Sequence, residues 1–316
     1  MQARPCSLPW PTYADCRRAG SAMPTLQLEN GTLRAEVLPE AGGGLLRFDL
    51  LHDCDVAPIF RPGTAEAALH DPRALACFPL VPWSNRIGGG RFPFRGRTIE
   101  VPHTRGDEPY PLHGHGWLMP WHPVSQTATS VELAAMVDHG RPFRYLALQR
   151  YALAGNTLNI ALTVRNEGSP LPFGLGVHPF FPRTPDVQLR AGATAMWQSA
   201  PDNLPTVLNA PSADADFRKL RKLEASAAIN HSFEGWDGRA EIVWPSRRVS
   251  VSITADTSRY VLYTPVAYDF FCFEPVDHAI NAHNLPGLPQ DHGLTILGTG
   301  QSLQRSYQFT VNRPDA

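Results

Sequence analysis

Short alternating runs of apolar and polar residues, separated by glycine turns, fill this chain from Thr25 onward. The first runs read TLQLEN, TLRAEVLPE and LLRFDLL, with Gly31 and then Gly42–Gly44 between them. A period of two is typical of strands with one buried face, and glycine marks the turns that join them. The pattern therefore predicts antiparallel strands from the start of the folded region.

The middle of the chain predicts a hairpin, with strands at Arg144–Leu153 and Thr157–Asn166 joined through Ala154–Asn156. Only Asp214–Ala228 has some 3.6-residue character, and we expect a short helix there. The 31 prolines exclude many long helices. Further strands are expected at Glu241–Trp244, Val249–Ala255, Arg259–Thr264, Leu294–Leu297 and Leu303–Val311.

These elements predict an all-β fold, a large antiparallel β-sandwich with few short helices. A chain of 316 residues can bury a sizeable core, and no compositional break marks a linker. We expect one domain over residues 23–316. Residues 1–22 have neither an apolar signal segment nor a packing pattern, so they predict a disordered N-terminal extension, with Met23 as an alternative start.

The charge content indicates which class of partner to expect, and the spacing of the cysteines indicates the location. The formal net charge is −1 and 18% of residues are charged, which gives no basic face for nucleic acid and favours a small neutral ligand. No apolar run approaches the ~20 residues of a membrane span, so we expect a soluble protein without membrane association. The cysteines lack CxxC spacing, which argues for reduced thiols and a cytoplasmic location; they are Cys6, Cys16, Cys54, Cys77 and Cys272.

The segment Phe271–His278, FCFEPVDH, is the first candidate for chemistry. The apolar residues before Glu274 have the composition of a buried strand, so its carboxyl group is expected to have little water around it. A carboxylate in that position is paired, hydrogen-bonded or used as a proton acceptor with a raised pKa. The alternative is a solvated residue at a strand end, with Pro275 marking the stop.

Asn85 and Arg86 end the proline-rich segment FPLVPWSNRI, directly before the glycines at 88–90. Such a segment cannot form a regular helix, so Arg86 is expected at a loop tip or cleft edge. Its guanidinium suits several hydroxyl or carboxylate oxygens at once. Alternatively, Arg86 binds loop carbonyls. The glycines match no nucleotide motif, because no strand-to-helix context follows.

The segment LHGHGW carries His113 and His115 at a spacing of two. In an extended chain both would point to one side, which raises the possibility of a metal site. No third ligand follows, since the next residues are Leu118–Trp121, so we expect no metal. Histidine beside glycine and tryptophan also suits a sugar, which stacks on aromatic rings and hydrogen-bonds through its hydroxyls.

His178 lies near the end of an apolar strand, FGLGVHPFF, and is expected to be partly buried. A core histidine that binds a carbonyl is the alternative. With Glu274 it would supply an acid and a base on a β scaffold. Gly235 and Gly238 frame a further turn, and the polar residues Asn230, His231 and Asp237 either reach one cleft or close the turn.

Together, FPLVPWSNRI, LHGHGW, GVHPFF, NHSFEGWDG and FCFEPVDHAINAHN resemble the aldose 1-epimerases, or mutarotases, in their bacterial branch with the LHGHGW form. The resemblance covers about residues 25–311. It implies a galactose mutarotase-like β-sandwich with the sugar in a cleft on one concave sheet, no cofactor, and a monomer or homodimer.

The resemblance also implies roles for single residues. Glu274 matches the general base and His178 the general acid, while His113 matches the histidine that contacts the sugar near its reacting end. Asn85 and Arg86 match the pair that binds sugar hydroxyls.

One position departs from the family. Asn230 stands where these enzymes usually have an aspartate that holds sugar hydroxyls. An amide keeps hydrogen-bonding capacity but lacks the charge, so affinity or sugar preference is affected while the acid–base pair is not.

The expected reaction interconverts α and β anomers by opening and reclosing the ring. We expect ionised Glu274 to take the proton of the C1 hydroxyl while cationic His178 donates one to the ring oxygen, with a bell-shaped pH profile. One rival is a hexose-6-phosphate 1-epimerase whose phosphate would bind Arg91, Arg95 and Arg97. A solvated hairpin edge is the favoured interpretation of those arginines.

Two other rivals belong to different classes. A non-catalytic carbohydrate-binding protein would bind sugar without accelerating anomer exchange. A polysaccharide lyase or hydrolase on a related sandwich would need a longer groove and a second carboxylate by the scissile bond.

Overall fold

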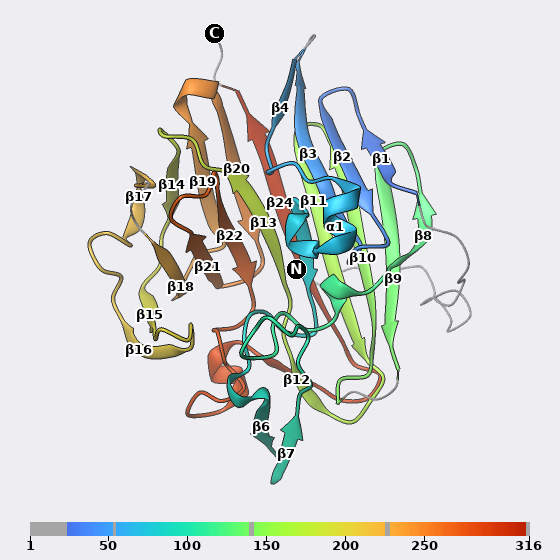
Figure 1. The fold of residues 1–316 in the computed structure, drawn as a ribbon, viewed down its shortest axis with the longest axis vertical. Coiled ribbons are helices and arrows are strands. Elements are labelled where there is room, and N and C mark those ends of the chain that lie inside the picture. Colours follow the sequence, from blue (N-terminus) through green and yellow to red (C-terminus); the bar gives the residue numbers. More distant parts are fainter. Residues whose placement is uncertain (1–23, 53–54, 139–141, 225–227, 314–316) are drawn as a thin grey trace.

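Two large β-sheets, packed face to face, make up most of the molecule (Figure 1). The structure is a computed structural model that describes residues 24–52, 55–138, 142–224 and 228–313. The prediction of an antiparallel β-sandwich with few short helices is confirmed, because the strands of both sheets pair antiparallel throughout the described residues.

The first sheet has eleven strands and carries the candidate site. Strand β4 (Asp55–Pro58) pairs only with β3, at one side of the main path. In their order across the sheet, the other strands are β1 (Leu26–Glu29), β2 (Leu33–Leu38), β3 (Gly44–His52), β5 (Cys77–Leu80), β13 (Gly176–Pro182), β22 (Phe270–Val276), β21 (Arg259–Thr264), β18 (Ile229–Glu234), β15 (Ala195–Ser199) and β16 (Pro205–Asn209).

The second sheet has nine strands and closes the core from the other side. Its strands, in spatial order, are β17 (Phe217–Lys222), β14 (Gln188–Ala191), β19 (Arg239–Trp244), β20 (Val249–Ala255), β24 (Ser302–Asn312), β11 (Thr157–Asn166), β10 (Tyr145–Ala154), β9 (Ser130–Val137) and β8 (His122–Gln126).

Smaller elements surround the sheets. Two strand pairs stand apart from the sandwich: β12 (Leu171–Phe173) with β23 (Thr295–Leu297), and β6 (Arg91–Phe94) with β7 (Arg97–Glu100). Helix α1 (Ala65–His70) begins after Thr64, whose hydroxyl accepts from the Ala67 N–H. The 3₁₀ turns are η2 (Pro72–Ala74), η3 (Gly88–Gly90), η4 (Gly116–Leu118), η5 (Pro245–Arg247) and η6 (Pro289–His292).

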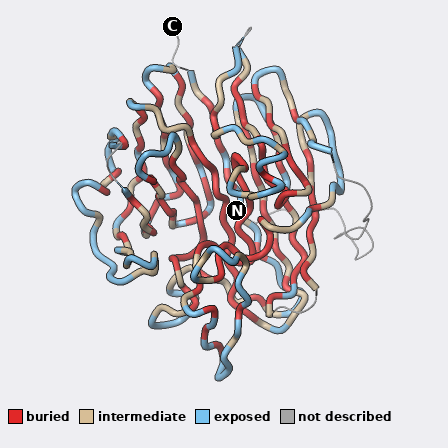
Figure 2. The backbone as a smooth tube through the Cα atoms, in the orientation of Figure 1, coloured by how far each residue is buried: buried red, intermediate tan, exposed pale blue. Residues whose placement is uncertain are grey.

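The alternation of buried and more exposed residues along the strands explains which side chains form the core. In β11 every second side chain is buried, so Leu158, Ile160, Leu162 and Val164 point between the sheets. Full burial of each such side chain stabilises the fold by about 2 kcal/mol. Figure 2 shows burial running along the strands, with exposure concentrated in the loops and hairpin ends. The period of two predicted from the sequence thus sends the apolar side chains of β11 into the hydrophobic layer between the sheets.

The expected hairpin is present, since β10 and β11 pair from Tyr145 opposite Asn166 to Ala154 opposite Thr157. The five other expected strands are also confirmed. They appear as β19, β20, β21, β23 and β24, with ends that differ from the expected ones by at most two residues.

The short helix expected over Asp214–Ala228 is wrong for the described part of that range. Phe217–Lys222 forms strand β17, which pairs with β14 at the sheet edge, while residues 225–227 lie outside the described residues. Phe217 and Leu223 are both buried. A spacing of six puts two side chains on the same face of a strand, whereas in a helix it turns them about 120° apart around the axis. Core contact therefore favours the extended form.

Several other expectations involve residues outside the described ranges. The N-terminal extension at 1–22 is among them, and the single-domain boundaries 23–316 stay a prediction. Cys77 and Cys272 are buried free thiols, while Cys6, Cys16 and Cys54 are not described. Within the described chain, no helix has the length and apolar character needed to cross a membrane.

Two loops that lead to the site are locked together at Gly114. This residue has φ +69° and forms a bridge with Val81, and a Cβ at its position would come within 2.4 Å of the Val81 carbonyl oxygen. Glycine is the residue that fits both the left-handed backbone and the close approach.

We therefore expect Gly114→Ala to lower the free energy of unfolding by about 3 kcal/mol, from left-handed strain together with the clash against backbone. Gly155→Ala is the matched control, because Gly155 has φ +57° but no heavy atom within 4 Å of an added Cβ. It should cost only the strain, about 1 kcal/mol. Urea unfolding of both variants measures the difference, and equal losses would contradict the proposed close contact.

Candidate functional site

Strand register brings the predicted acid and base together. Strands β5 and β13 pair with Phe78 opposite His178. Strands β13 and β22 pair with Phe180 opposite Cys272. Two residues along this antiparallel pair, His178 lies opposite Glu274, so one row of the sheet carries Phe78, His178 and Glu274. The two candidates, about a hundred residues apart in sequence, are cross-strand neighbours.

A second row, next to the first, brings in Asn230. Here Phe180 lies opposite Cys272, Cys272 opposite Tyr263, and Tyr263 opposite Asn230. The row crosses β13, β22, β21 and β18. Residues in adjacent rows on one face of a sheet are within reach of a common ligand.

These side chains lie on the face of the first sheet that points away from the second sheet. On β13, Val177 and Phe181 belong to the core between the sheets, whereas His178 and Phe180 alternate to the other face. The second sheet therefore supports the site without contributing side chains to it.

A cavity of about 690 Å³ covers this face. That volume lies within the range of about 300–1,000 Å³ typical of small-molecule sites. All six residues predicted for the site line it: Asn85, Arg86, His113, His178, Asn230 and Glu274. It is also lined by Arg61, Asp71, Arg73, Ala74, Phe78, Glu108, Leu112, Trp117, Phe180, Asn203, Tyr263, Tyr268 and Phe270.

His178 and Glu274 are in contact. His178 Nε2 lies 3.3 Å from Glu274 Oε1, and the two side chains are only 10% and 3% exposed. The separation is slightly longer than an ideal hydrogen bond, and such catalytic contacts tighten when substrate binds. Glu274 Oε2 is buried and accepts no hydrogen bond from the described residues. The pair therefore has an acceptor oxygen to spare for a ligand.

Burial reverses the charges expected for this pair. It raises the pKa of Glu274 to about 8, an effect opposed by the positive charge of Arg86. Burial also lowers the pKa of His178 to about 3. Near pH 7 the carboxyl is therefore protonated and the imidazole neutral, instead of the carboxylate and imidazolium expected from sequence. In either arrangement the pair holds one proton in total, and the two forms differ only in its position.

Aromatic rings fix the His178 imidazole. Phe78 and Phe180 both stack on this ring, with centroids 4.5 Å and 4.7 Å from that of His178 and 5.9 Å from each other. Trp117 extends the stack beyond Phe78, at 5.0 Å. Phe78 is the cross-strand partner of His178 and Phe180 lies two residues along the same strand, so the sheet itself generates the stack.

Asn85 and His113 hold each other through their backbones. The Asn85 N–H donates to His113 Nδ1 and the His113 N–H donates to the Asn85 carbonyl, both at 2.9 Å. Both residues have left-handed backbones, with φ of 56° and 58°. Since Nδ1 accepts a hydrogen bond, the proton of the neutral imidazole is on Nε2. Burial lowers the pKa of His113 well below its usual value, which keeps the ring neutral.

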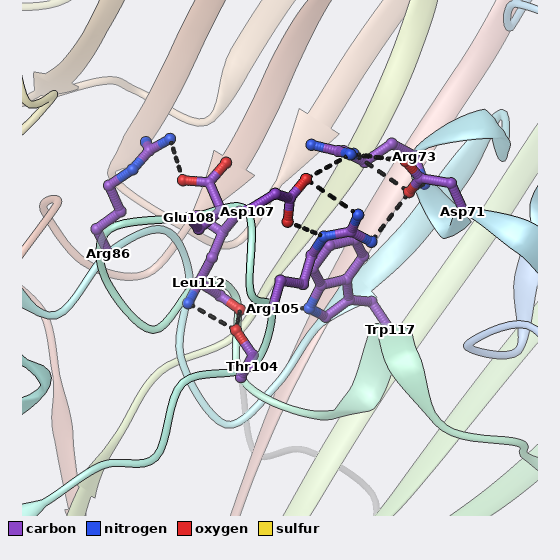
Figure 3. Close-up of polar contacts among 9 residues, drawn as sticks. All are labelled: Asp71, Arg73, Arg86, Thr104, Arg105, Asp107, Glu108, Leu112 and Trp117. Atoms are coloured by element: carbon purple, nitrogen blue, oxygen red, sulfur yellow. Dashed lines mark hydrogen bonds and ion pairs between the residues drawn. The ribbon is translucent and has the colours of Figure 1, made fainter.

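Glu108 orients Arg86. Arg86 Nη2 donates to Glu108 Oε2 at 3.0 Å (Figure 3). Its Nη1 donates to Asn85 Oδ1 at 3.2 Å. The two side chains of the ion pair are 13% and 15% exposed. Arg86 thus has a fixed position near the acid–base pair. The alternative that Arg86 serves only to bind loop carbonyls is not supported by its contacts.

An ion network fastens the loop that carries Glu108. Arg73 Nη2 lies 2.9 Å from Asp107 Oδ2, and Arg105 Nη1 lies 3.1 Å from Asp71 Oδ1 (Figure 3). The Thr104 hydroxyl closes the base of the loop through hydrogen bonds with the backbone of Leu112 (Figure 3). The network joins residues 104–112 to the turn η2, and both segments border the cavity.

The segment that follows Glu274 supports the Asn85–Arg86 loop from behind. His278 Nε2 accepts from the Ser84 N–H at 2.9 Å, and Asn281 Oδ1 accepts from the Gly88 N–H at 2.8 Å. The Asn281 N–H donates to the Arg86 carbonyl. Hydrogen bonds therefore join the segment Ser84–Ile87 (SNRI) to the segment Val276–Asn281 (VDHAIN).

Asn230 faces the cavity beside Asn203. The Asn230 Nδ2 donates to Asn203 Oδ1 at 2.9 Å, so this contact does not use the Asn230 amide oxygen. Its neighbours in the turn motif do not join it. His231 contacts the Ser199 hydroxyl at 3.2 Å, and Asp237 accepts from the Arg239 N–H, closing the turn.

Other sequence candidates also lie outside the cavity. His115 packs its ring edge against Trp83, and the left-handed backbone at 113 and 114 separates it from His113. Arg91, Arg95 and Arg97 are exposed residues of the β6–β7 hairpin and do not line the cavity. The expectation of a solvated edge is confirmed for these arginines.

Within the described chain, the side chains that come close enough to share a metal ion are His178, Cys272 and Glu274. Their donor atoms lie within 4.8 Å of one another. A thiol binds metal as the thiolate. Burial raises the pKa of Cys272 well above its usual value, and Glu274 is also protonated near pH 7. The protonation of this cluster favours proton transfer over metal binding.

Sequence reasoning missed several cavity residues. Phe180 could have been found from its spacing of two after His178 in a strand. Glu108 and Arg61 have no local signal, because each reaches the site from an irregular segment through tertiary contacts.

Comparison with known proteins gives the family. The sequence profile described as aldose 1-epimerase matches residues 24–310. The chain is 32% identical over 306 residues to a protein called YphB from Escherichia coli (strain K12), an alignment that covers 90% of this chain and 97% of YphB.

Two solved structures are also similar to this chain. A crystal structure from Escherichia coli K12, named as a candidate aldose 1-epimerase, superposes with a TM-score of 0.85 at 29% identity, covering 92% of this chain and 99% of that one. A galactose mutarotase-like protein from Clostridium acetobutylicum has a TM-score of 0.78 at 18% identity, with 92% and 95% covered, and supports the fold alone. With the profile match over nearly the whole described length, these similarities show that the chain belongs to the aldose 1-epimerase family.

Proposed function

We propose that this protein is an aldose 1-epimerase, a mutarotase that interconverts the α and β anomers of a free aldose such as glucose or galactose. The observation that carries the proposal is the buried contact between His178 and Glu274 inside a cavity lined by hydrogen-bonding side chains. The predicted roles are kept: Glu274 is the general base and His178 the general acid. Asn85, Arg86, His113 and Asn230 bind the sugar.

The single proton of the pair sets the mechanism. Transfer of this proton from Glu274 to His178 produces the carboxylate and imidazolium that the reaction needs, without proton uptake from water. Glu274 then takes the proton of the C1 hydroxyl as His178 protonates the ring oxygen. The C1–O5 bond breaks to give the open aldehyde. After rotation about C1–C2 the ring closes on the other face, and both protons return.

Only protons move between enzyme and sugar, so this reaction requires no redox cofactor and no Lewis acid. Each positioned acid or base is typically worth ~10²–10⁴ in rate. The packing of Phe78 and Phe180 on the His178 ring and the fixed Arg86 supply the positioning that such a contribution requires.

The charges in the cavity argue against a hydrolase or lyase. Besides Glu274, its carboxylates are Asp71 and Glu108, and each forms an ion pair with an arginine. Neither is available as a second acid or nucleophile by a glycosidic bond. A cytoplasmic location and a monomeric or dimeric state remain expectations from the sequence.

We expect Glu274→Gln to lower kcat for anomer exchange by ~10²–10⁴, because glutamine cannot accept the C1 hydroxyl proton. Polarimetry of freshly dissolved α-glucose and α-galactose measures the rate. Glu241→Gln on β19 is the matched control and should keep the wild-type rate, since Glu241 is remote from the cavity. A wild-type rate for Glu274→Gln would rule out the assigned base. Saturable sugar binding by a wild-type protein that accelerates nothing would instead identify a binding protein.

The pH profile should show the shared proton. Below about pH 8 the pair carries one proton, and above it the proton is lost, so no acid remains and kcat/KM should fall tenfold per pH unit. The acidic limb should lie near pH 3, where His178 takes up a second proton. NMR exchange spectroscopy, corrected for the uncatalysed rate, measures the profile. An alkaline limb near pH 6.5, the ordinary imidazole value, would mean that the two groups titrate independently.

A further inference from the structure

The charges that line the cavity do not balance. Arg73 pairs with Asp71 and Asp107, and Arg86 pairs with Glu108. Arg61 is the remaining arginine of the cavity lining, and no carboxylate oxygen among the described residues lies within 4.0 Å of its nitrogens.

Arg61 is held rigidly in place. Its Nη2 donates to the carbonyls of Arg73 and Leu75, at 2.6 and 3.0 Å. Its guanidinium carbon lies 4.1 Å from the centre of the Phe180 ring and 4.6 Å from that of Phe270. Of five N–H donors, the three on Nε and Nη1 make no hydrogen bond within the described chain. The cation is thus preorganised, with donors left for a ligand.

The surroundings of Arg61 make an anion favourable there. Burial lowers the pKa of the guanidinium, which Cys272 and then the exposed Asp269 raise by a smaller amount, and Asp269 forms no ion pair with Arg61. A partly buried cation without a counter-charge is stabilised by an anionic ligand, and hydrogen bonds between charged partners are about twice as strong as neutral ones. Asn203 and Asn230, which also line the cavity, add no negative charge.

Arg61 is also at a useful distance from the acid–base pair. The centre of the Phe180 ring lies 4.1 Å from the guanidinium carbon and 4.7 Å from the centre of the His178 ring, so these two groups are less than about 9 Å apart. A hexopyranose with C1 at His178 and Glu274 can span this distance with a group on C6.

We propose that Arg61 determines specificity for an aldose that carries a negatively charged group, a carboxylate or a phosphate, at the end of the sugar remote from C1. This proposal rests on the proposed mutarotase function and names its substrate class. It is independent of the arginines of the β6–β7 hairpin, which lie outside the cavity.

The test compares anomer exchange of glucose, glucuronate and glucose 6-phosphate by NMR, for wild type, Arg61→Gln, Arg61→Lys and Arg95→Gln. We expect wild-type kcat/KM to be at least about tenfold higher for one of the two charged sugars than for glucose. Whichever charged sugar is preferred identifies the carboxylate or the phosphate as the group bound.

Arg61→Gln should lower the ratio of charged to neutral kcat/KM at least about tenfold, mainly through KM, and Arg61→Lys should retain part of it. Arg95→Gln is the matched control and should keep the ratio, because Arg95 is an exposed arginine of the β6–β7 hairpin that does not line the cavity. Added salt should reduce the wild-type ratio.

The outcomes separate the two proposals. If wild type accelerates none of the three sugars, the proposed function fails. If it accelerates glucose but has no preference for either charged sugar, the specificity proposal is overturned, whatever the variants do. A preference that persists in Arg61→Gln, or a loss that is equal for charged and neutral sugars, also overturns the role of Arg61.

Discussion

A carboxyl group and an imidazole lie against each other with little access to bulk water, and the chemistry of the site depends on that burial. Desolvation disfavours both charged forms, so Glu274 keeps its proton and His178 remains neutral. The cost of separating charge inside the protein makes the location of one proton sensitive to small changes in the surroundings. In the proposed reaction, a polar sugar that enters the cavity changes those surroundings directly, so the pair is stable at rest and becomes reactive with substrate.

The sandwich provides the rigidity that this pair needs. Neighbouring strands set the register, and alternation sends one set of side chains into the core and the next set into the cavity. The stacked rings of Phe78 and Phe180 then restrict the imidazole to one plane. Loops from distant parts of the chain complete the site, but they are tied to the sheet and to one another through backbone hydrogen bonds, as at Asn85 and His113.

Charge is organised differently at the two sides of the cavity. At one side, Arg86 and Glu108 neutralise each other and leave directional donors and acceptors suited to hydroxyl groups. At the other, Arg61 is supported by aromatic rings and carbonyls, which orient its charge but do not cancel it. Under the proposed function, a pocket with both features would distinguish sugars by their hydroxyl pattern and by their charge.

Local sequence patterns were enough to predict the strands with clear alternation, such as the hairpin of β10 and β11. They also singled out six of the residues that line the cavity. Those signals are local, because a period of two and a glycine turn follow from neighbouring residues. The sequence could not determine that Phe217 and its neighbours pair as an edge strand, that Glu108 reaches Arg86, or that Glu274 is protonated. Each of these depends on groups brought close only by folding, and both desolvation and ion pairing act through space and not along the chain.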